Sequence, residues 1–364
     1  MADTYATRTF GTPTSPYKFT ISFWVKRSKL SVSHIAPITA GTYTSTNMGQ
    51  FLFSGDDTLL CQTYNAGGSA TMARDTNMKF RDTNGWYNIV LGVDGTLASA
   101  GDRQKLYVNG ELITSFAAST DASQDTDLAW NQNGIVCMLG NRATTSYYFD
   151  GYLSHVHFID GTQYQASDFG STDATTGQWK INTAPSVTYG NNGFFVLKNG
   201  NSLTDQSTNS NDFTLGGGAI VDMKDCPSDV YATMNNLDNY EQGSTFTVCN
   251  TKLEWNTNNK TNYSTFAMNK GKFYWEMKYA NITGGADAMI GMSLADTRQP
   301  DDYPGHDSTA WSYYASSGNK YNNGGSSYGD SWTTNDIIGV AFDADTRTLW
   351  FSKNGVWQNS ATIS

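Results

Sequence analysis

Asn-Gly pairs flanked by alternating apolar and polar residues constrain the fold of this chain more than any other feature. They occur in residues 106–113 and 349–357, and in a weaker form in residues 195–200. Asn-Gly favours the type I′ turn of a two-residue β-hairpin, because both central residues adopt positive φ there. No window of the chain carries an apolar 3.6-residue period over three turns. The sequence therefore predicts an all-β protein.

A first group of strands is expected in the N-terminal part of the chain. Residues 19–25 alternate strictly, so that Thr20, Ser22 and Trp24 share one face and the apolar residues between them share the other. A short strand with one apolar face must cover that face, and two packed antiparallel sheets do so. The same pattern recurs in residues 50–53, 87–93, 105–108, 135–139 and 152–159.

A second group of strands begins near Leu253. Between the two groups, residues 161–250 are rich in Ser, Thr, Asn and Gly but also contain aromatic residues, which require burial. This stretch is therefore expected to be a packed connector with a few strands. The predicted domains are residues 1–170, a connector at 171–250, and residues 251–364, and the strands of the last domain are expected in residues 271–279, 288–293, 336–343 and 348–353.

Four segments of the N-terminal part resemble the laminin-G/concanavalin-like jelly-roll superfamily. They are residues 19–27, 85–90, 105–110 and 150–156, in that order. The C-terminal part resembles a SPRY domain, whose opening strand and central hairpin are similar to residues 271–277, 336–343 and 349–355. The resemblance implies two tandem antiparallel β-sandwiches, a concanavalin-like jelly roll and then a SPRY-like domain, joined by a β/loop connector.

The whole arrangement resembles jelly-roll-plus-SPRY virion proteins of marine tailed bacteriophages, and residues 173–180, 205–213 and 225–235 of the connector fit as well. A SPRY domain usually continues for one or two strands past its Lys-Asn-Gly hairpin, whereas this sequence stops at Ser364. We expect either that the chain is a fragment of a longer fibre or appendage protein, or that a partner completes the sheet by strand addition.

Charge and hydropathy exclude two classes of partner. The formal net charge is −10, with 23 Lys and Arg residues and no basic run, so concentrated positive charge for phosphate contacts is missing and nucleic-acid binding is not expected. The apolar stretches are only a few residues long, which excludes membrane insertion. The first residues lack the basic and apolar regions of a secretory signal. The protein is therefore expected to be made in a host cytoplasm and released by lysis.

Glycoside hydrolases of the concanavalin-like fold provide the main alternative function. Such enzymes need two carboxylates facing one scissile bond, and the superfamily members that resemble laminarinases carry paired Glu residues on a single strand. No two Glu residues of this chain share a strand at alternating spacing, and the pairs Asp56-Asp57 and Asp301-Asp302 are more typical of turns. The chain is expected not to be an enzyme, with a secreted carbohydrate-active enzyme or carbohydrate-binding module as the alternative. The four Glu residues are Glu111, Glu241, Glu254 and Glu276.

Metal ligands are sparse. His155 and His157 share one face of a strand and could present two imidazoles to a metal, but Val156 and Phe158 form the apolar face, so a plain polar face is the simpler interpretation. The four cysteines show no metal-binding spacing and require no disulfide; they are Cys61, Cys137, Cys226 and Cys249.

Calcium is the one cofactor that the resemblance leaves open, because jelly rolls of this superfamily often hold it through loop oxygens. Asp94, Asp102, Asp150 and Asp160 could serve a structural calcium. Three of the four precede Gly, so they also have a simple role as turn formers. No metal ligands are assigned.

Residues 303–332 are the predicted contact surface. Rigid aromatic residues separated by small polar ones make good recognition surfaces, and aromatic faces stack on sugar rings. The alternative is that part of this stretch is strand and its aromatic residues are core. The candidate ligand-binding residues are Trp311, Tyr313, Tyr314, Tyr321 and Tyr328, with Tyr147 and Tyr148 as weaker candidates in the first domain.

These observations together predict a non-enzymatic virion protein of a tailed phage, such as a tail fibre, head fibre or decoration. Its expected partners are other virion proteins, copies of itself and host-surface glycans. An intracellular SPRY adaptor that binds peptides is disfavoured by the jelly roll that precedes the SPRY-like part.

Overall fold

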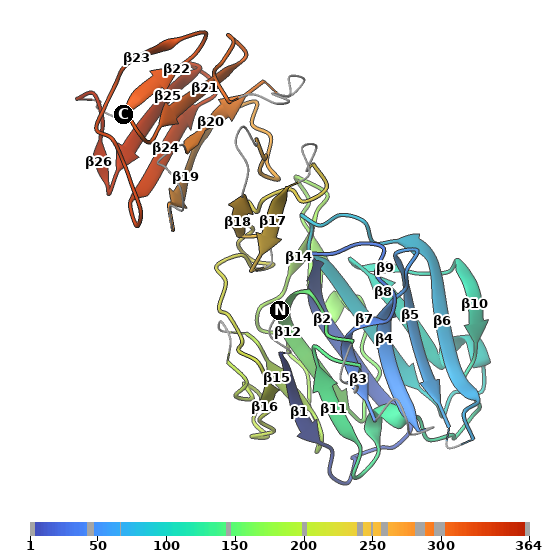
Figure 1. Ribbon diagram of the computed structural model, residues 1–364. Helices are drawn as coiled ribbons and strands as arrows, with labels where there is room; N and C mark the ends of the chain where they lie inside the picture. Colours follow the sequence, from blue (N-terminus) through green and yellow to red (C-terminus); the bar gives the residue numbers. More distant parts are fainter. Residues whose placement is uncertain are drawn as a thin grey trace. The chain divides into compact units, whose positions relative to one another are not determined.

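The computed structural model describes residues 4–41, 47–65, 67–142, 147–198, 202–238, 243–248, 250–255, 261–280, 288–294 and 303–360. The chain divides into two compact units, Met1–Ala232 and Thr233–Ser364 (Figure 1). In the described residues the regular elements are β-strands apart from three short 3-10 helices, so the predicted all-β class is confirmed. None of the described helices is long and apolar enough to cross a lipid bilayer.

The first unit is a sandwich of an eight-stranded and a six-stranded antiparallel sheet, with strand orders β10-β6-β5-β4-β3-β11-β1-β16 and β15-β12-β2-β7-β8-β9 (Figure 1). The first sheet contains β1 (Tyr5–Thr9), β3 (Ile35–Ala40), β4 (Met48–Phe53), β5 (Thr58–Tyr64), β6 (Ala70–Lys79), β10 (Phe116–Thr120), β11 (Val136–Leu139) and β16 (Thr214–Gly217). The second contains β2 (Lys18–Arg27), β7 (Tyr87–Asp94), β8 (Gln104–Val108), β9 (Glu111–Leu112), β12 (Gly151–Asp160) and β15 (Phe194–Val196). Smaller elements are the β13 (Gly170–Thr172) and β14 (Trp179–Ile181) ribbon and the 3-10 helices η1 (Ala100–Asp102), η2 (Ala129–Asn131) and η3 (Ala166–Asp168).

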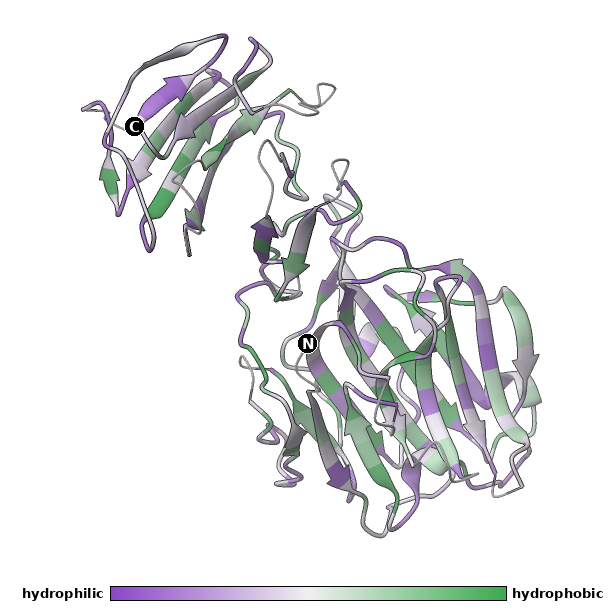
Figure 2. Ribbon diagram, in the orientation of Figure 1, coloured by the Kyte–Doolittle hydropathy of each residue, from purple (hydrophilic) through white to green (hydrophobic). Residues whose placement is uncertain are grey.

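The core of the first unit lies between the two sheets. The predicted apolar face of β2 is fully buried there, and Phe23 packs edge-on against Phe51 of β4 with ring centroids 5.0 Å apart. Trp130 of η2 packs beside Phe51 and is 0% exposed. Hydrophobic and hydrophilic residues follow one another along the strands of both sheets (Figure 2). Alternation brings the apolar residues to this interface. The buried residues on this face of β2 are Phe19, Ile21, Phe23 and Val25.

The opposite face of β2 is also buried, which alternation alone did not predict. Thr20 is 0% exposed, and its hydroxyl donates a 2.8 Å hydrogen bond to the carbonyl of Thr162. A second apolar cluster joins Val90 and Ile159 of this face to Phe169, and the half-buried Trp179 of the connector packs against it. The predicted packed connector thus forms an outer layer, and its β15 and β16 pair with β12 and β1 of the first unit. The predicted limits at residues 170 and 250 stay a prediction.

The two strong hairpin predictions are confirmed. Asn109 and Gly110 have φ of 48° and 86°, and Asn354 and Gly355 have φ of 49° and 81°. These turns join β8 to β9 and β25 to β26. The weaker third turn, Asn199-Gly200, lies outside the described residues.

The second unit contains two four-stranded antiparallel sheets and the β17–β18 ribbon. Its core lies between the sheets and is built around Tyr313, Trp332 and Phe351, which are at most 3% exposed. One sheet has the order β19 (Lys272–Lys278), β24 (Ile337–Asp343), β25 (Thr348–Lys353), β26 (Val356–Trp357). The other has the order β20 (Met289–Ser293), β21 (Ala310–Tyr314), β22 (Asn319–Tyr321), β23 (Gly325–Ser327), and the ribbon pairs β17 (Ser244–Thr247) with β18 (Lys252–Trp255).

Candidate functional site

The aromatic residues predicted to form one contact surface lie on two faces of their sheet. Tyr313 is 0% exposed and packs against Trp332 and Phe351 in the core, which corrects its assignment as a contact residue: strand alternation turns it inward. Tyr328 is half-buried beside Tyr313, and its hydroxyl accepts a 3.0 Å hydrogen bond from the Phe351 N–H. Tyr328 therefore supports the core as well.

The remaining predicted residues of this segment stay accessible. Tyr314 and Tyr321 are half-buried and meet edge to face with centroids 5.7 Å apart, and Tyr303 packs against Tyr321 at 5.6 Å. Trp311 is 41% exposed. Trp311 shares its face of β21 with Tyr313, whereas Tyr314 points to the other face, so the accessible rings of this segment do not form the single surface that the sequence predicted.

Tyr147 and Tyr148, the candidates in the first unit, are half-buried. The guanidinium of Arg142 lies 5.8 Å from the Tyr147 ring, and His34 packs on the same ring at 5.4 Å. Tyr148 contacts Tyr5 at 6.2 Å. Both rings therefore contact neighbouring side chains of the first unit.

A more concentrated aromatic surface lies on the other sheet of the second unit. Along β19, Trp275 and Met277 pack on the core, so the neighbouring Tyr274 and Glu276 face outward. Tyr274 pairs with Ala341 of β24, which in turn pairs with Trp350 of β25, so these three side chains form one outward-facing row. Trp357 of β26 pairs with Ser352, which lies two residues after Trp350 on β25 and therefore on the same face. We call Tyr274, Trp350 and Trp357 the aromatic platform.

Small residues on the central strand keep the platform open. The residue between Tyr274 and Trp350 is Ala341, and a Cβ on the nearby Gly339 would lie 2.6 Å from the Tyr274 hydroxyl. The resulting shallow pocket has a volume of about 250 Å³. Its lining residues are Lys272, Phe273, Tyr274, Ala341, Phe342, Asp343, Trp350 and Trp357.

The platform combines one exposed ring, Tyr274, and two half-buried rings, Trp350 and Trp357, with fixed polar groups. Tyr274 is 54% exposed and meets Trp357 edge to face, with centroids 6.2 Å apart. The Tyr274 hydroxyl donates a 2.6 Å hydrogen bond to the Glu276 carboxylate. Burial and this carboxylate raise the pKa of Tyr274, so the hydroxyl stays protonated. An apolar floor with polar edges suits a ring that has apolar faces and hydroxyl edges, such as a pyranose.

The sequence contains a signal for this surface, although the contact surface was predicted in residues 303–332. Adjacent aromatic residues in a strand place one ring on each face. The pairs Tyr274-Trp275 and Trp350-Phe351 lie on neighbouring strands of one sheet, and each pair sends one ring to the core and one outward.

A second pocket, of about 330 Å³, lies in the first unit between the ends of β6, β8, β9 and β10. Its polar residues are paired: Arg74 contacts Asp121 at 2.5 Å, and Lys105 contacts Asp102 at 3.3 Å. The pocket is therefore less open to a new ligand than the aromatic platform.

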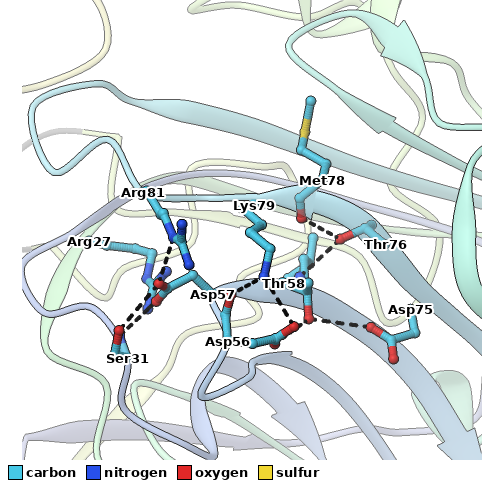
Figure 3. Close-up of polar contacts among 11 residues, drawn as sticks. Arg27, Ser31, Asp56, Asp57, Thr58, Asp75, Thr76, Met78, Lys79 and Arg81 are labelled. Carbon is cyan, nitrogen blue, oxygen red and sulfur yellow. Dashed lines mark hydrogen bonds and ion pairs between the residues drawn. The ribbon is translucent and has the colours of Figure 1, made fainter.

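The acidic residues considered as catalytic carboxylates lie on different elements. Glu111, Glu254 and Glu276 are on β9, β18 and β19, and Glu241, Asp301 and Asp302 lie outside the described residues. Asp56 and Asp57 occupy a turn, as expected, and point to different partners (Figure 3).

The two histidines considered as metal ligands have protein partners. His155 and His157 face the connector and are buried, with Nδ1 atoms 2.8 Å from the Ser154 hydroxyl and 2.9 Å from the Tyr189 hydroxyl. Within the described ranges, no three His, Cys, Asp or Glu side chains gather as a metal ion would require. Cys61 and Cys137 are buried free thiols and Cys226 is a half-buried one, while Cys249 lies outside the described residues.

The four aspartates considered for calcium also bind protein groups. Asp94 pairs with Lys18 and Asp150 with Lys29, each at 2.9 Å, and Asp102 pairs with Lys105. Asp160 is buried and accepts hydrogen bonds from the backbone N–H groups of Thr14, Ser15 and Asn192 and from the Asn131 side chain. These carboxylates therefore hold loops in place through protein donors.

Solved structures similar to this chain come from diverse proteins. A SAP-like pentraxin from Limulus polyphemus is 11% identical, with 61% of this chain and 98% of that chain covered and a TM-score of 0.33. The CBM40 of a Ruminococcus gnavus sialidase, bound to α2,3-sialyllactose, is 19% identical, with 37% and 71% covered and a TM-score of 0.29. Domains LG4-5 of the mouse laminin α1 chain are 7% identical, with 99% and 75% covered and a TM-score of 0.34.

Sequence comparisons locate two domains. A curated relative, a Ran-binding proteins 9/10 homolog from Drosophila melanogaster, is 30% identical over 89 residues, which are 24% of this chain and only 9% of the relative. The family profile of the concanavalin A-like lectin/glucanases superfamily matches residues 2–167, and the SPRY profile matches residues 272–363. Residues 2–167 are thus a concanavalin A-like domain and residues 272–363 a SPRY domain of the same chain.

Proposed function

We propose that this protein is a non-enzymatic adhesion component of a tailed-bacteriophage particle, in a tail fibre, head fibre or decoration, and that it binds host-surface glycans through the aromatic platform. It would be made in the host cytoplasm, exposed on the released particle, and assembled with other virion proteins or copies of itself. The resemblance of the domain order and connector to phage virion proteins supports the particle assignment.

The aromatic platform is the observation that carries the glycan proposal. Tyr274, Trp350 and Trp357 lie on one sheet face and line one shallow pocket with polar groups at its edge. Strands hold the rings in place, so little conformational entropy is lost when a sugar stacks on them. The concanavalin A-like profile covers lectins and glucanases alike, which keeps the alternative of a carbohydrate-active enzyme or its binding module in view.

The non-enzymatic part of the proposal is supported by the arrangement of carboxylates. The three described Glu residues are on separate strands, and the acidic residue of the larger pocket, Asp102, is paired with Lys105. A hydrolase needs two carboxyl groups that flank one bond. Incubation of the purified protein with bacterial polysaccharides and a reducing-sugar assay tests this, and turnover of any of them would favour the enzymatic alternative.

A glycan array followed by calorimetry tests the binding site. Trp357→Ala should weaken binding of the recognised glycan about ten-fold or more, because a stacked aromatic contact of about 1.4 kcal/mol corresponds to that factor. Tyr274→Phe should weaken it less, because the ring remains.

Trp311→Ala is the matched control, because Trp311 is an exposed tryptophan on the other sheet of the same unit. It should leave affinity unchanged. Loss of binding in Trp311→Ala but not in Trp357→Ala would instead place the site in the segment predicted from the sequence, and absence of binding to any glycan would contradict the proposal.

A further inference from the structure

A fully buried ion pair joins the end of β2 to the segment that follows β16. The Nζ atom of Lys26 lies 2.9 Å from Oδ2 of Asp225, and the two side chains are 1% and 2% exposed. The ammonium also lies 5.5 Å from the ring centroid of the buried Tyr152. Removing two charges from water costs several kcal/mol for each ion, and their mutual attraction often does not repay this cost. A reaction that removed both charges would therefore be favoured at this site.

The groups around the pair hold an amine in contact with a carboxyl group. The amine nitrogen is next to the Asp225 carboxyl group, and the other carboxyl oxygen, Oδ1, accepts a 2.8 Å hydrogen bond from the backbone N–H of Tyr231. A fixed N–H at that position stabilises the negative charge that develops on a carboxyl oxygen under nucleophilic attack. Holding amine and carboxyl at contact distance also replaces a bimolecular encounter with an intramolecular step.

We propose that Lys26 and Asp225 condense to an intramolecular isopeptide bond once the first unit has folded. A proton passes from the Lys26 ammonium to Oδ2, and the neutral amine then attacks Cγ of Asp225. The Cγ–Oδ2 bond breaks, and Oδ2 leaves as water with a second proton from the nitrogen. The ammonium and carboxylate become one amide and one water molecule, without an oxidant or a further reactant. The exclusion of water from this buried site slows the reverse hydrolysis.

The bond would fix the end of the first unit. It would link positions separated by 199 residues, so the segment that carries Asp225, Cys226 and Pro227 could not peel from the sheet without breaking a covalent bond. This gives a physical role to a connector motif that glycan binding does not explain. Such a link suits a protein exposed to mechanical load on a particle, but it does not depend on the glycan proposal.

Mass spectrometry of the full-length chain, denatured and reduced, tests the proposal directly. The expected mass is that of the sequence minus one water, and proteolysis should release a branched peptide that joins residues 26 and 225. Reduction excludes a disulfide as the cause of the link. A mass equal to that of the sequence, with Lys26 and Asp225 in separate peptides, would overturn the proposal whether or not the protein binds glycans.

Two variants assign the reacting residue. Lys26→Arg keeps the positive charge but removes the amine, and it should restore the mass expected from its sequence. Lys18→Arg is the matched control, because Lys18 pairs with Asp94 at the same 2.9 Å distance but is 34% exposed; it should keep the loss of water. A loss of water that persists in Lys26→Arg would also overturn the proposal.

Discussion

At the residue scale, Asp56 and Asp57 show how neighbouring carboxylates come to have different roles. Asp57 has a left-handed φ of 71° and a side chain that is 1% exposed, and it contacts Arg27 and Arg81 at 3.1 Å each (Figure 3). Asp56 is 61% exposed and lies 3.4 Å from Lys79. Burial raises the pKa of Asp57, but the Ser31 N–H and the two guanidinium groups outweigh burial and leave that pKa below its ordinary value.

Asp57→Asn should therefore destabilise the first unit by about 3 kcal/mol, because the substitution leaves the Arg27 guanidinium buried without its counter-charge. Because the folded-state pKa is lowered, the contribution of Asp57 is present above its unfolded pKa and is lost as the pH falls through the folded value. Urea unfolding at neutral pH measures the loss. Asp56→Asn is the control and should leave the midpoint unchanged; equal losses in both variants would contradict this assignment.

At the scale of elements, β12 shows how the connector changes the chemistry of a strand. His157 stacks on Phe195 of β15 with centroids 3.9 Å apart, and both histidines of the strand are buried. Burial and then Lys198 lower the pKa of His155 to about 4, and burial, His155 and Lys198 lower that of His157 well below its ordinary value. A strand face that was expected to be solvated is instead an interior surface with two neutral imidazoles.

The stability of the first unit should consequently fall as the pH drops from about 6.5 to 4. In that window the unfolded chain binds protons at these histidines and the folded chain does not, so acid favours unfolding. The shift of His155 alone corresponds to about 3 kcal/mol by pH 4. Urea midpoints measured across this range test the expectation, and His155→Gln should flatten the dependence. His306 is an exposed histidine of the second unit, so His306→Gln should leave the pH dependence of the urea midpoint unchanged. A urea midpoint that does not vary with pH in the protein of natural sequence would contradict the prediction.

At the scale of the whole molecule, two separate cores predict two unfolding transitions. One core is centred on residues such as Phe23 and Phe51, and the other on Tyr313 and Trp332. Each core buries its own apolar surface, so each unit should melt cooperatively by itself. Calorimetry should show that Asp57→Asn lowers the midpoint temperature of one transition and that Trp332→Ala lowers that of the other. Trp332→Ala should reduce the free energy of unfolding of the second unit by about 3 kcal/mol or more. A single transition that both variants lower would contradict the prediction.

The sequence by itself determined many of the strands and the two Asn-Gly turns, because alternation and turn chemistry are local properties of the chain. Its resemblance to two domain families predicted the domain order. Only the tertiary structure decided which faces are covered. Thr20 and His157 read as solvent-facing by alternation, yet the connector buries them. Tyr313 and Tyr274 both lie on strands of the second unit, but Tyr313 is buried in the core and Tyr274 is exposed. The pairing of Lys26 with Asp225 is equally invisible in the sequence, because burial depends on which distant segment packs against a face.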